Sequence, residues 1–174
     1  MKRLAMLALI LAATPVAADT THHGQHSPYA GLEAREIKAL SSEEIADLTA
    51  GRGMGLALAA ELNGYPGPRH VLDLAQELQL SAEQQQKTSV LFEAMRAETS
   101  ALGAELIEAE RVLDRLFAEK RATPETVAAA TERAAAVEAK LRAAHLRYHL
   151  AMVEVLTPDQ VMAYNHLRGY TTHH

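Results

Sequence analysis

Apolar side chains recur at helical spacing over two long stretches of the chain. The first stretch follows Ser81 and has apolar residues at positions 91, 95, 102, 106, 109, 113, 116 and 117. The second follows Thr123-Pro124 and has Val127, Ala130, Ala134, Val137, Leu141, Ala144, Tyr148, Met152 and Val155. Spacings of three and four predict two long helices, the first of about 38 residues. Because the break between them is short, we expect an antiparallel hairpin.

Shorter apolar runs flank this hairpin and predict short helices. We expect these helices at residues 43–50, at 56–62, from Pro68 to the cap at Ser81, and at 158–168. No stretch alternates apolar and polar residues over the length of a strand. The sequence therefore predicts an all-α fold, a long antiparallel helical hairpin with short flanking helices.

The second long helix is apolar on two sides near its end. At 100° per residue, Leu146, Leu150 and Val153 lie about 120–180° around the helix from the main stripe. We expect either the last helix of the chain or another subunit to cover this second surface.

Two five-residue stretches read almost alike, and each predicts a helix start. In both, a Ser or Thr hydroxyl can cap the helix while the Gln three residues later returns to the N–H of the capping residue, which is a capping box. A looser copy has Ser41 as the cap and Glu44 as the returning side chain. The two stretches are Leu80-Ser81-Ala82-Glu83-Gln84 and Leu156-Thr157-Pro158-Asp159-Gln160, with Leu80, Ser81, Gln84, Leu156, Thr157 and Gln160 as the helix-cap residues.

The first eighteen residues have the pattern of a secretory signal. Basic residues 2–3 precede an apolar run at 4–13 and small residues at 16–18. The run of about ten residues is too short for a bilayer, which takes roughly 20, and an uncleaved anchor remains the alternative. We expect a periplasmic protein that begins at Asp19 after cleavage and has no membrane span.

The rest of the chain divides by composition. We predict a signal peptide at 1–18, a flexible His-containing arm at 19–38, short helices and turns at 39–67, the main helical domain at 68–170, and a tail ending in His at 171–174.

Composition narrows the classes of partner. The chain of 174 residues has no cysteine, so no disulfide framework holds an exported fold together. Without the two basic residues of the signal, the formal net charge of −5 becomes about −7, which does not attract nucleic acid. Aromatic residues make up 4% of the chain, so the core is thin. Thin helical cores often find a partner, and we expect a homodimer.

Histidines are the candidate metal ligands. His145 and His149 are four residues apart, so their rings stand on one side of a helix at a spacing that can hold a transition metal. Short His-rich stretches at the chain ends are plausible binders of zinc or copper. The alternatives stay open: a hydrogen-bonded pair at the border of the core, and solvated tails. The further candidate ligands are His166, His173, His174, His22, His23 and His26.

Enzyme signatures are missing from the sequence. There is no His-Glu-x-x-His, no Gly-x-Ser-x-Gly, no cysteine nucleophile and no phosphate-binding loop with its lysine. We therefore predict a protein that is not an enzyme.

Together these features resemble the Spy/CpxP family of periplasmic proteins, including its zinc resistance-associated and heavy-metal-sensor branches. The resemblance rests on the signal, the helical pattern and the two Leu-Thr-x-x-Gln-type motifs at Leu80 and Leu156, the first with Ser in place of Thr. It implies a bent, often dimeric helical cradle. Such proteins bind unfolded or misfolded envelope proteins without ATP, or report envelope and metal stress to a membrane sensor.

Three functions follow as hypotheses. The first is a stress-related chaperone or adaptor of Spy/CpxP type in the periplasm. The second is a metal-binding protein that uses its histidines for zinc or copper. The third is a non-catalytic helical module that docks onto one envelope partner.

Overall fold

The computed structural model describes residues 27–170, and in that part of the chain it contains helices and no strand. The all-α prediction is therefore confirmed. Met1–Ala30 and Gly31–His174 form separate units, and the description below concerns the second. Its elements are the 3₁₀ helix η1 (Leu32–Ala34) and the helices α1 (Ser42–Ala50), α2 (Leu58–Glu61), α3 (Pro68–Asp73), α4 (Ala82–Ala118), α5 (Pro124–Val153) and α6 (Pro158–Leu167).

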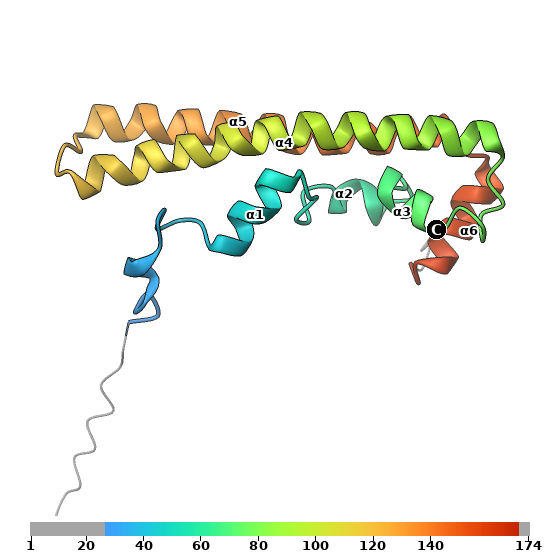
Figure 1. Ribbon diagram of the computed structural model, residues 1–174, viewed down its shortest axis with the longest axis horizontal. Coiled ribbons are helices and arrows are strands. Elements are labelled where there is room, and N and C mark those ends of the chain that lie inside the picture. The colour runs from blue at the N-terminus through green and yellow to red at the C-terminus, as the bar shows by residue number, and fades with distance from the viewer. Residues whose placement is uncertain (1–26, 171–174) are drawn as a thin grey trace, which may run out of the picture. The chain divides into compact units, whose positions relative to one another are not determined.

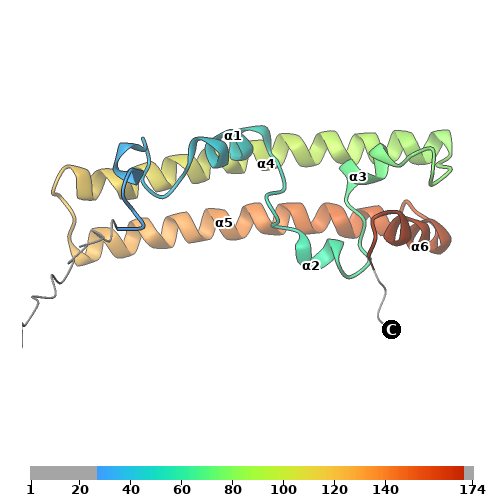
Figure 2. The ribbon, with the colours of Figure 1, turned by 90° about the horizontal axis from the view of Figure 1, so that it is seen from below.

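Helices α4 and α5 pack against each other as the predicted antiparallel hairpin (Figure 1, Figure 2). α4 has 37 residues and begins after Ser81, as the spacing of its apolar residues predicts. α5 begins after Thr123, whose hydroxyl accepts a hydrogen bond from the N–H of Thr126. Lys120 has a φ of 56°, a left-handed conformation that ends the first helix and lets the chain return.

Both helix-cap motifs form capping boxes. Ser81 Oγ accepts from the Gln84 N–H at 3.1 Å, and Gln84 Oε1 accepts from the Ser81 N–H at 3.0 Å. Thr157 and Gln160 repeat the arrangement at 3.2 and 2.9 Å. Ser41 and Glu44 form a third box at the start of α1. The motifs therefore fix where α4 and α6 begin.

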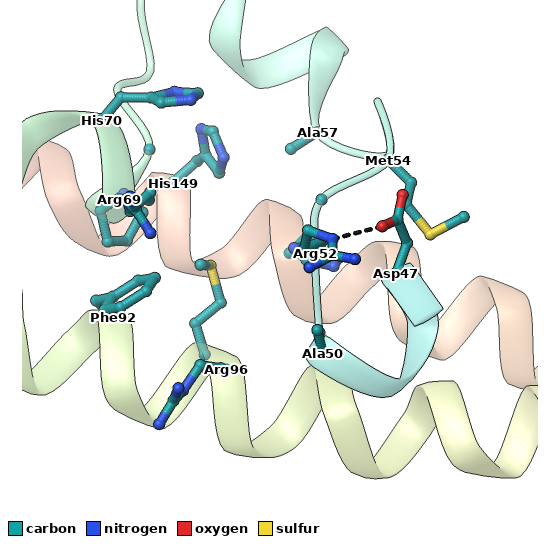
Figure 3. Close-up of a pocket in the computed structure, with 16 residues that line it drawn as sticks. Asp47, Ala50, Arg52, Met54, Ala57, Arg69, His70, Phe92, Arg96 and His149 are labelled. Carbon is teal, nitrogen blue, oxygen red and sulfur yellow. Dashed lines mark hydrogen bonds and ion pairs between the residues drawn. The ribbon is translucent and has the colours of Figure 1, made fainter. Parts of the chain in front are cut away.

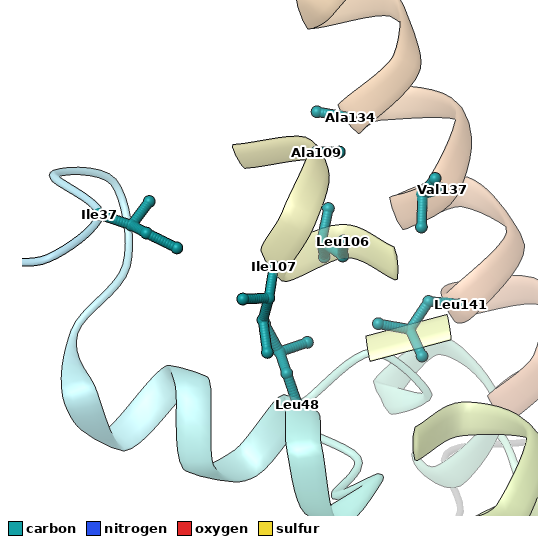
Figure 4. Close-up of a cluster of buried hydrophobic side chains, with 8 residues drawn as sticks. All are labelled: Ile37, Leu48, Leu106, Ile107, Ala109, Ala134, Val137 and Leu141. Atoms are coloured by element: carbon teal, nitrogen blue, oxygen red, sulfur yellow. The ribbon is translucent and has the colours of Figure 1, made fainter. Parts of the chain in front are cut away.

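Helices α1, α2 and α3 lie along one face of the hairpin (Figure 1). α1 approaches α4 so closely that a Cβ on Gly103 would overlap the carbonyl oxygen of Leu48. This approach buries the apolar side of α1 in a core cluster with both long helices (Figure 4). The cluster consists of Ile37, Leu48, Leu106, Ile107, Ala109, Ala134, Val137 and Leu141.

The packed region begins earlier than the sequence suggests. The sequence predicts a flexible arm at residues 19–38, but Ile37 is fully buried in the core cluster, and the Lys38 N–H donates to Asp114 at 3.1 Å. Residues from Gly31 onward belong to the second unit. One isolated apolar side chain in a polar stretch has no periodicity, which is why the pattern missed it. Residues 19–26 lie outside the described part of the chain.

The helix predicted from Pro68 to Ser81 is wrong in its second half. α3 ends at Asp73, and turns continue the chain, with Gln79 at a φ of 51°. Leu78 and Leu80 are both buried in a second cluster. In a continuous helix these two side chains would point about 160° apart, so burying both requires the helix to stop. The second cluster also contains Val71, Met152, Leu156 and Tyr164.

The second apolar surface of α5 is covered only in part. Leu146 and Val153 are half-buried, but Leu150 is 57% exposed, so α6 does not cover the whole of it. Its coverage by another subunit stays a prediction. Within residues 27–170, no helix combines the length and the apolar character that a bilayer crossing needs.

Candidate functional site

A cavity of about 620 Å³ opens between the hairpin and the segments that lie on it. Its walls come from the end of α1 and the loop after it, from the start of α3, and from facing stretches of α4 and α5 (Figure 3). The fold thus gathers side chains that are distant in the sequence. The lining side chains that could contact a ligand or a metal ion are His70, His145, His149, Arg52, Arg69, Arg96, Asp47, Met54, Met95 and Phe92.

His149 is buried and held in one orientation. Its Nδ1 lies 2.7 Å from the carbonyl oxygen of Tyr65, so in the neutral ring Nδ1 carries the proton and donates it. Nε2 then keeps its lone pair. Gly67 packs on the ring, and a Cβ there would come within 2.9 Å of Cε1. The glycine is therefore required for the approach of the chain to His149.

His70 is oriented by a buried carboxylate. Its Nδ1 lies 3.3 Å from Oε1 of Glu61, a residue that is 6% exposed. Because the carboxylate can only accept, Nδ1 must be the donor, so in the neutral ring Nε2 is the lone-pair nitrogen.

Glu61 joins the cavity to the C-terminal helix. Its Oε1 accepts hydrogen bonds from the hydroxyls of Tyr164 and Tyr170, while Oε2 lies 3.6 Å from His149 Nδ1. Burial acts to raise the pKa of Glu61, but the hydrogen bonds from His70 and Tyr164 outweigh it and lower this pKa to about 2. Burial and the bond to Glu61 raise the pKa of Tyr164. Glu61 is therefore a carboxylate and Tyr164 a neutral phenol near pH 7.

His145 is the unsatisfied group of the cavity. It is 2% exposed, and its Nε2 has no hydrogen-bond partner among the described residues. Burial, and to a lesser extent His149, lowers the pKa of His145, which keeps the ring neutral. A buried polar atom without a partner costs about 1–3 kcal/mol. Beside a cavity, a water molecule or a bound ligand can supply the missing partner of such an atom.

The structure separates the histidines that the sequence grouped. His145 and His149 line one cavity, whereas His166 is exposed on α6 and does not line it. His22, His23, His26, His173 and His174 lie outside the described residues. The interpretation of a hydrogen-bonded pair holds for Nδ1 of His149 but not for Nε2 of His145.

Sequence reasoning missed His70, Glu61 and the two methionines that line the cavity, Met54 and Met95. These residues lie in the short helices and loops or on the stripe of α4, where no spacing links them to His145. Met152, which is close to His149 in the sequence, is fully buried in the second apolar cluster and does not line the cavity.

The donor set of the cavity suits a transition metal ion. Imidazole nitrogen binds zinc and copper, and thioether sulfur binds copper(I). Ligating histidines almost always donate their other N–H to a carboxylate or a carbonyl, and His70 and His149 both do so. Within residues 27–170, however, no three His, Asp or Glu side chains lie together as an assembled metal site.

Within the described residues, the chain is an all-α protein in which a long helical hairpin carries short helices over a histidine-lined cavity. The chain belongs to the heavy-metal resistance family, whose model matches residues 53–163. This is the Spy/CpxP-like, zinc resistance-associated family that the cap motifs predict. The matched region contains the three cavity histidines, Glu61 and both cap motifs, and it begins just after Arg52. No curated protein and no solved structure matches the chain.

Proposed function

We propose that this protein binds a transition metal ion, zinc or copper, in the periplasm as part of heavy-metal resistance, and that the cavity containing His145 is the binding site. The observation that carries the proposal is Nε2 of His145, which is buried, unpartnered among the described residues and beside the cavity shared with His70 and His149.

The hydrogen bonds around the cavity support this role. Nε2 is the nitrogen that His70 and His149 would offer, because Nδ1 of each is held by Glu61 or Tyr65. Such partners fix the tautomer and increase the basicity of the ligating nitrogen. A bound metal ion would supply charge and a coordination centre at these rings. Because the three rings are not assembled, binding requires their side chains to draw together.

The proposed location rests on the sequence and the family. Residues 1–18 have the signal pattern, and the heavy-metal resistance family agrees with a role outside the cytoplasm. A cysteine-free chain needs no oxidation to fold there.

The test is calorimetric titration of residues 19–174 with Zn²⁺ and Cu²⁺, with light scattering alongside to follow assembly. We expect stoichiometric binding that His145→Ala/His149→Ala removes and that His166→Ala leaves intact, since His166 lies outside the cavity. Binding weaker than about millimolar, which is about 4 kcal/mol, would reject the proposal. Equal binding by the double variant would reject the site.

A second candidate function is the binding of unfolded envelope proteins, on a different surface of the molecule. An apolar groove of about 400 Å³ lies between the start of α4 and the end of α5. Val90 in this groove and Leu150 near it on α5 are each 57% exposed. Suppression of aggregation of a denatured client should weaken in Val90→Ser/Leu150→Ser if this surface binds clients. If the variant suppresses aggregation as well as the wild type, this surface does not bind clients. The same variant tests whether the surface forms a dimer or docks onto a membrane sensor.

A further inference from the structure

A buried methionine shares the cavity with the histidines. Because the sequence contains no cysteine, a sulfur ligand in this protein must come from methionine. Two methionines, Met54 and Met95, line the cavity. Met54 is 41% exposed, and in Figure 3 it lies with Asp47 and Arg52, away from His149. Met95 is 8% exposed, so its thioether is the one held inside the fold.

Met95 and His149 stand at nearly the same level of the hairpin. Glu98, about one turn after Met95 on α4, accepts a hydrogen bond from the Tyr148 hydroxyl at 3.0 Å and pairs with Arg147. Because α4 and α5 are antiparallel, one turn back along α4 from Glu98 corresponds to one turn forward along α5 from Tyr148. His149 lies within that turn. Both side chains line the cavity, so the thioether and the imidazole face the same space.

His145 and His149 add two nitrogens on one side of α5. Residues four apart on a helix have Cβ atoms about 5–6 Å from each other. Nδ1 of His149 is held by the Tyr65 carbonyl, which leaves Nε2 free, and Nε2 of His145 has no partner among the described residues. The cavity therefore offers two imidazole nitrogens and one thioether sulfur, all on buried side chains.

This set of donors discriminates between the two metals of the proposed function. Zinc takes four ligands, and its protein ligands are nitrogen, oxygen and thiolate sulfur. Among the described residues, no three His, Asp or Glu side chains form a group that could hold it. Copper(I) favours soft ligands such as thioether sulfur and is stable with fewer of them. Its single charge also costs less to bury than the double charge of Zn²⁺.

We infer that the cavity selects copper(I), with Nε2 of His145, Nε2 of His149 and the sulfur of Met95 as its ligands. The inference rests on the proposed function, because it names the ion that the same site takes. Zn²⁺, which gains little from a thioether, would use His70 instead. The rings of His70 and His149 flank one carboxylate, Glu61, with their Nδ1 atoms 3.3 and 3.6 Å from its oxygens.

The test compares copper(I) and Zn²⁺ in the same variants of residues 19–174. Copper(I) is supplied without oxygen as its bicinchoninate complex, whose colour fades as the protein withdraws the ion, and Zn²⁺ is titrated calorimetrically. We expect Met95→Leu, which nearly keeps the side-chain volume, to weaken copper(I) binding at least tenfold and to change zinc affinity less than about twofold. His70→Ala should weaken zinc binding more than copper(I) binding. Met162→Leu, 61% exposed on α6 and outside the cavity, is the matched control and should change neither.

Two results of these titrations would overturn the inference. One is a copper(I) affinity that Met95→Leu leaves at the level of the control, and the other is an equal loss of copper(I) and zinc affinity in that variant. Zinc binding that His145→Ala/His149→Ala removes would in either case leave the proposed function intact. Absence of both copper(I) and zinc binding would reject both ideas.

A measurement on the unmutated protein guards against a variant that fails to fold. X-ray absorption at the copper edge distinguishes sulfur from nitrogen among the atoms bonded to the metal. We expect sulfur and nitrogen together in the copper(I)-loaded protein, and a copper ion bonded to nitrogen alone would overturn the inference. Because the chain has no cysteine, a sulfur signal has to come from a methionine, and its loss in Met95→Leu but not in Met162→Leu assigns it.

Discussion

The side-chain amides of Gln84 and Gln160 hydrogen-bond to each other in both directions. Gln84 Nε2 donates to Gln160 Oε1 at 2.7 Å, and Gln160 Nε2 donates to Gln84 Oε1 at 3.1 Å. Each Nε2 also donates to a backbone carbonyl, of Val155 and Leu78 respectively, and each Oε1 also accepts from the N–H of its own cap. The two cap motifs are therefore one structure, which ties the start of α4 to the start of α6.

Replacing one glutamine should cost more than a lost helix cap. Gln160→Leu removes one of the two partners of each Gln84 amide atom, and it also removes the side-chain partner of the Leu78 carbonyl and of the Thr157 N–H. We expect a loss of about 1–3 kcal/mol in unfolding free energy. Gln86→Leu, at an exposed position of the same helix, is the control. Urea denaturation followed by circular dichroism measures both. A cost for Gln160→Leu no larger than that of the control would show that the amide pair is not formed.

Replacing Gly103 with alanine should destabilise the fold, although alanine has the smallest side chain. In an exposed helix, Gly→Ala stabilises by about 0.5–1 kcal/mol. Here the new Cβ would overlap the Leu48 carbonyl, so Gly103→Ala should instead destabilise by about 1–3 kcal/mol by pushing α1 away from α4. Thermal unfolding decides between the two signs, and a raised melting temperature would contradict the packing of α1.

Ionisation of Glu61 should make the free energy of unfolding decrease in acid. Its pKa is lowered to about 2 in the folded protein, below the ordinary value of 4.5, so the folded state favours the carboxylate. The resulting stabilisation is complete above pH 4.5 and disappears as pH falls from there towards 2. We expect it to be worth about 3 kcal/mol at neutral pH. Unfolding free energies of the wild type and of Glu61→Gln, compared between neutral and acidic pH, should converge in acid, and a constant difference would contradict the assignment.

Gly67 and Gly53 form a matched pair for the cavity. A Cβ on Gly67 would come within 2.9 Å of the His149 ring, whereas a Cβ on Gly53 would meet nothing within 4 Å. Gly67→Ala should therefore displace His149 and weaken zinc binding at least tenfold, and Gly53→Ala should leave the affinity unchanged. Calorimetric titration compares the two variants. Equal affinities would place the metal away from His149.

The sequence predicts the long hairpin and the helix starts because these depend on local rules. The apolar stripes of α4 and α5 and the caps at Ser81, Thr123 and Thr157 are visible in one stretch of chain at a time. The end of α3 at Asp73 depends on the joint burial of Leu78 and Leu80, which only the packed cluster imposes. Likewise, His145 and His149 are visible as a pair, but His70 and Glu61 join them only because α2 and α3 fold back onto α5.

The amide pair of Gln84 and Gln160 links positions 76 residues apart. Links between such distant positions are often made by disulfides, which reductants open. A closure made of two amides has no thiol chemistry, and the chain has no cysteine anywhere. The link between the starts of α4 and α6 is therefore indifferent to reductants and offers no thiol to a soft metal ion.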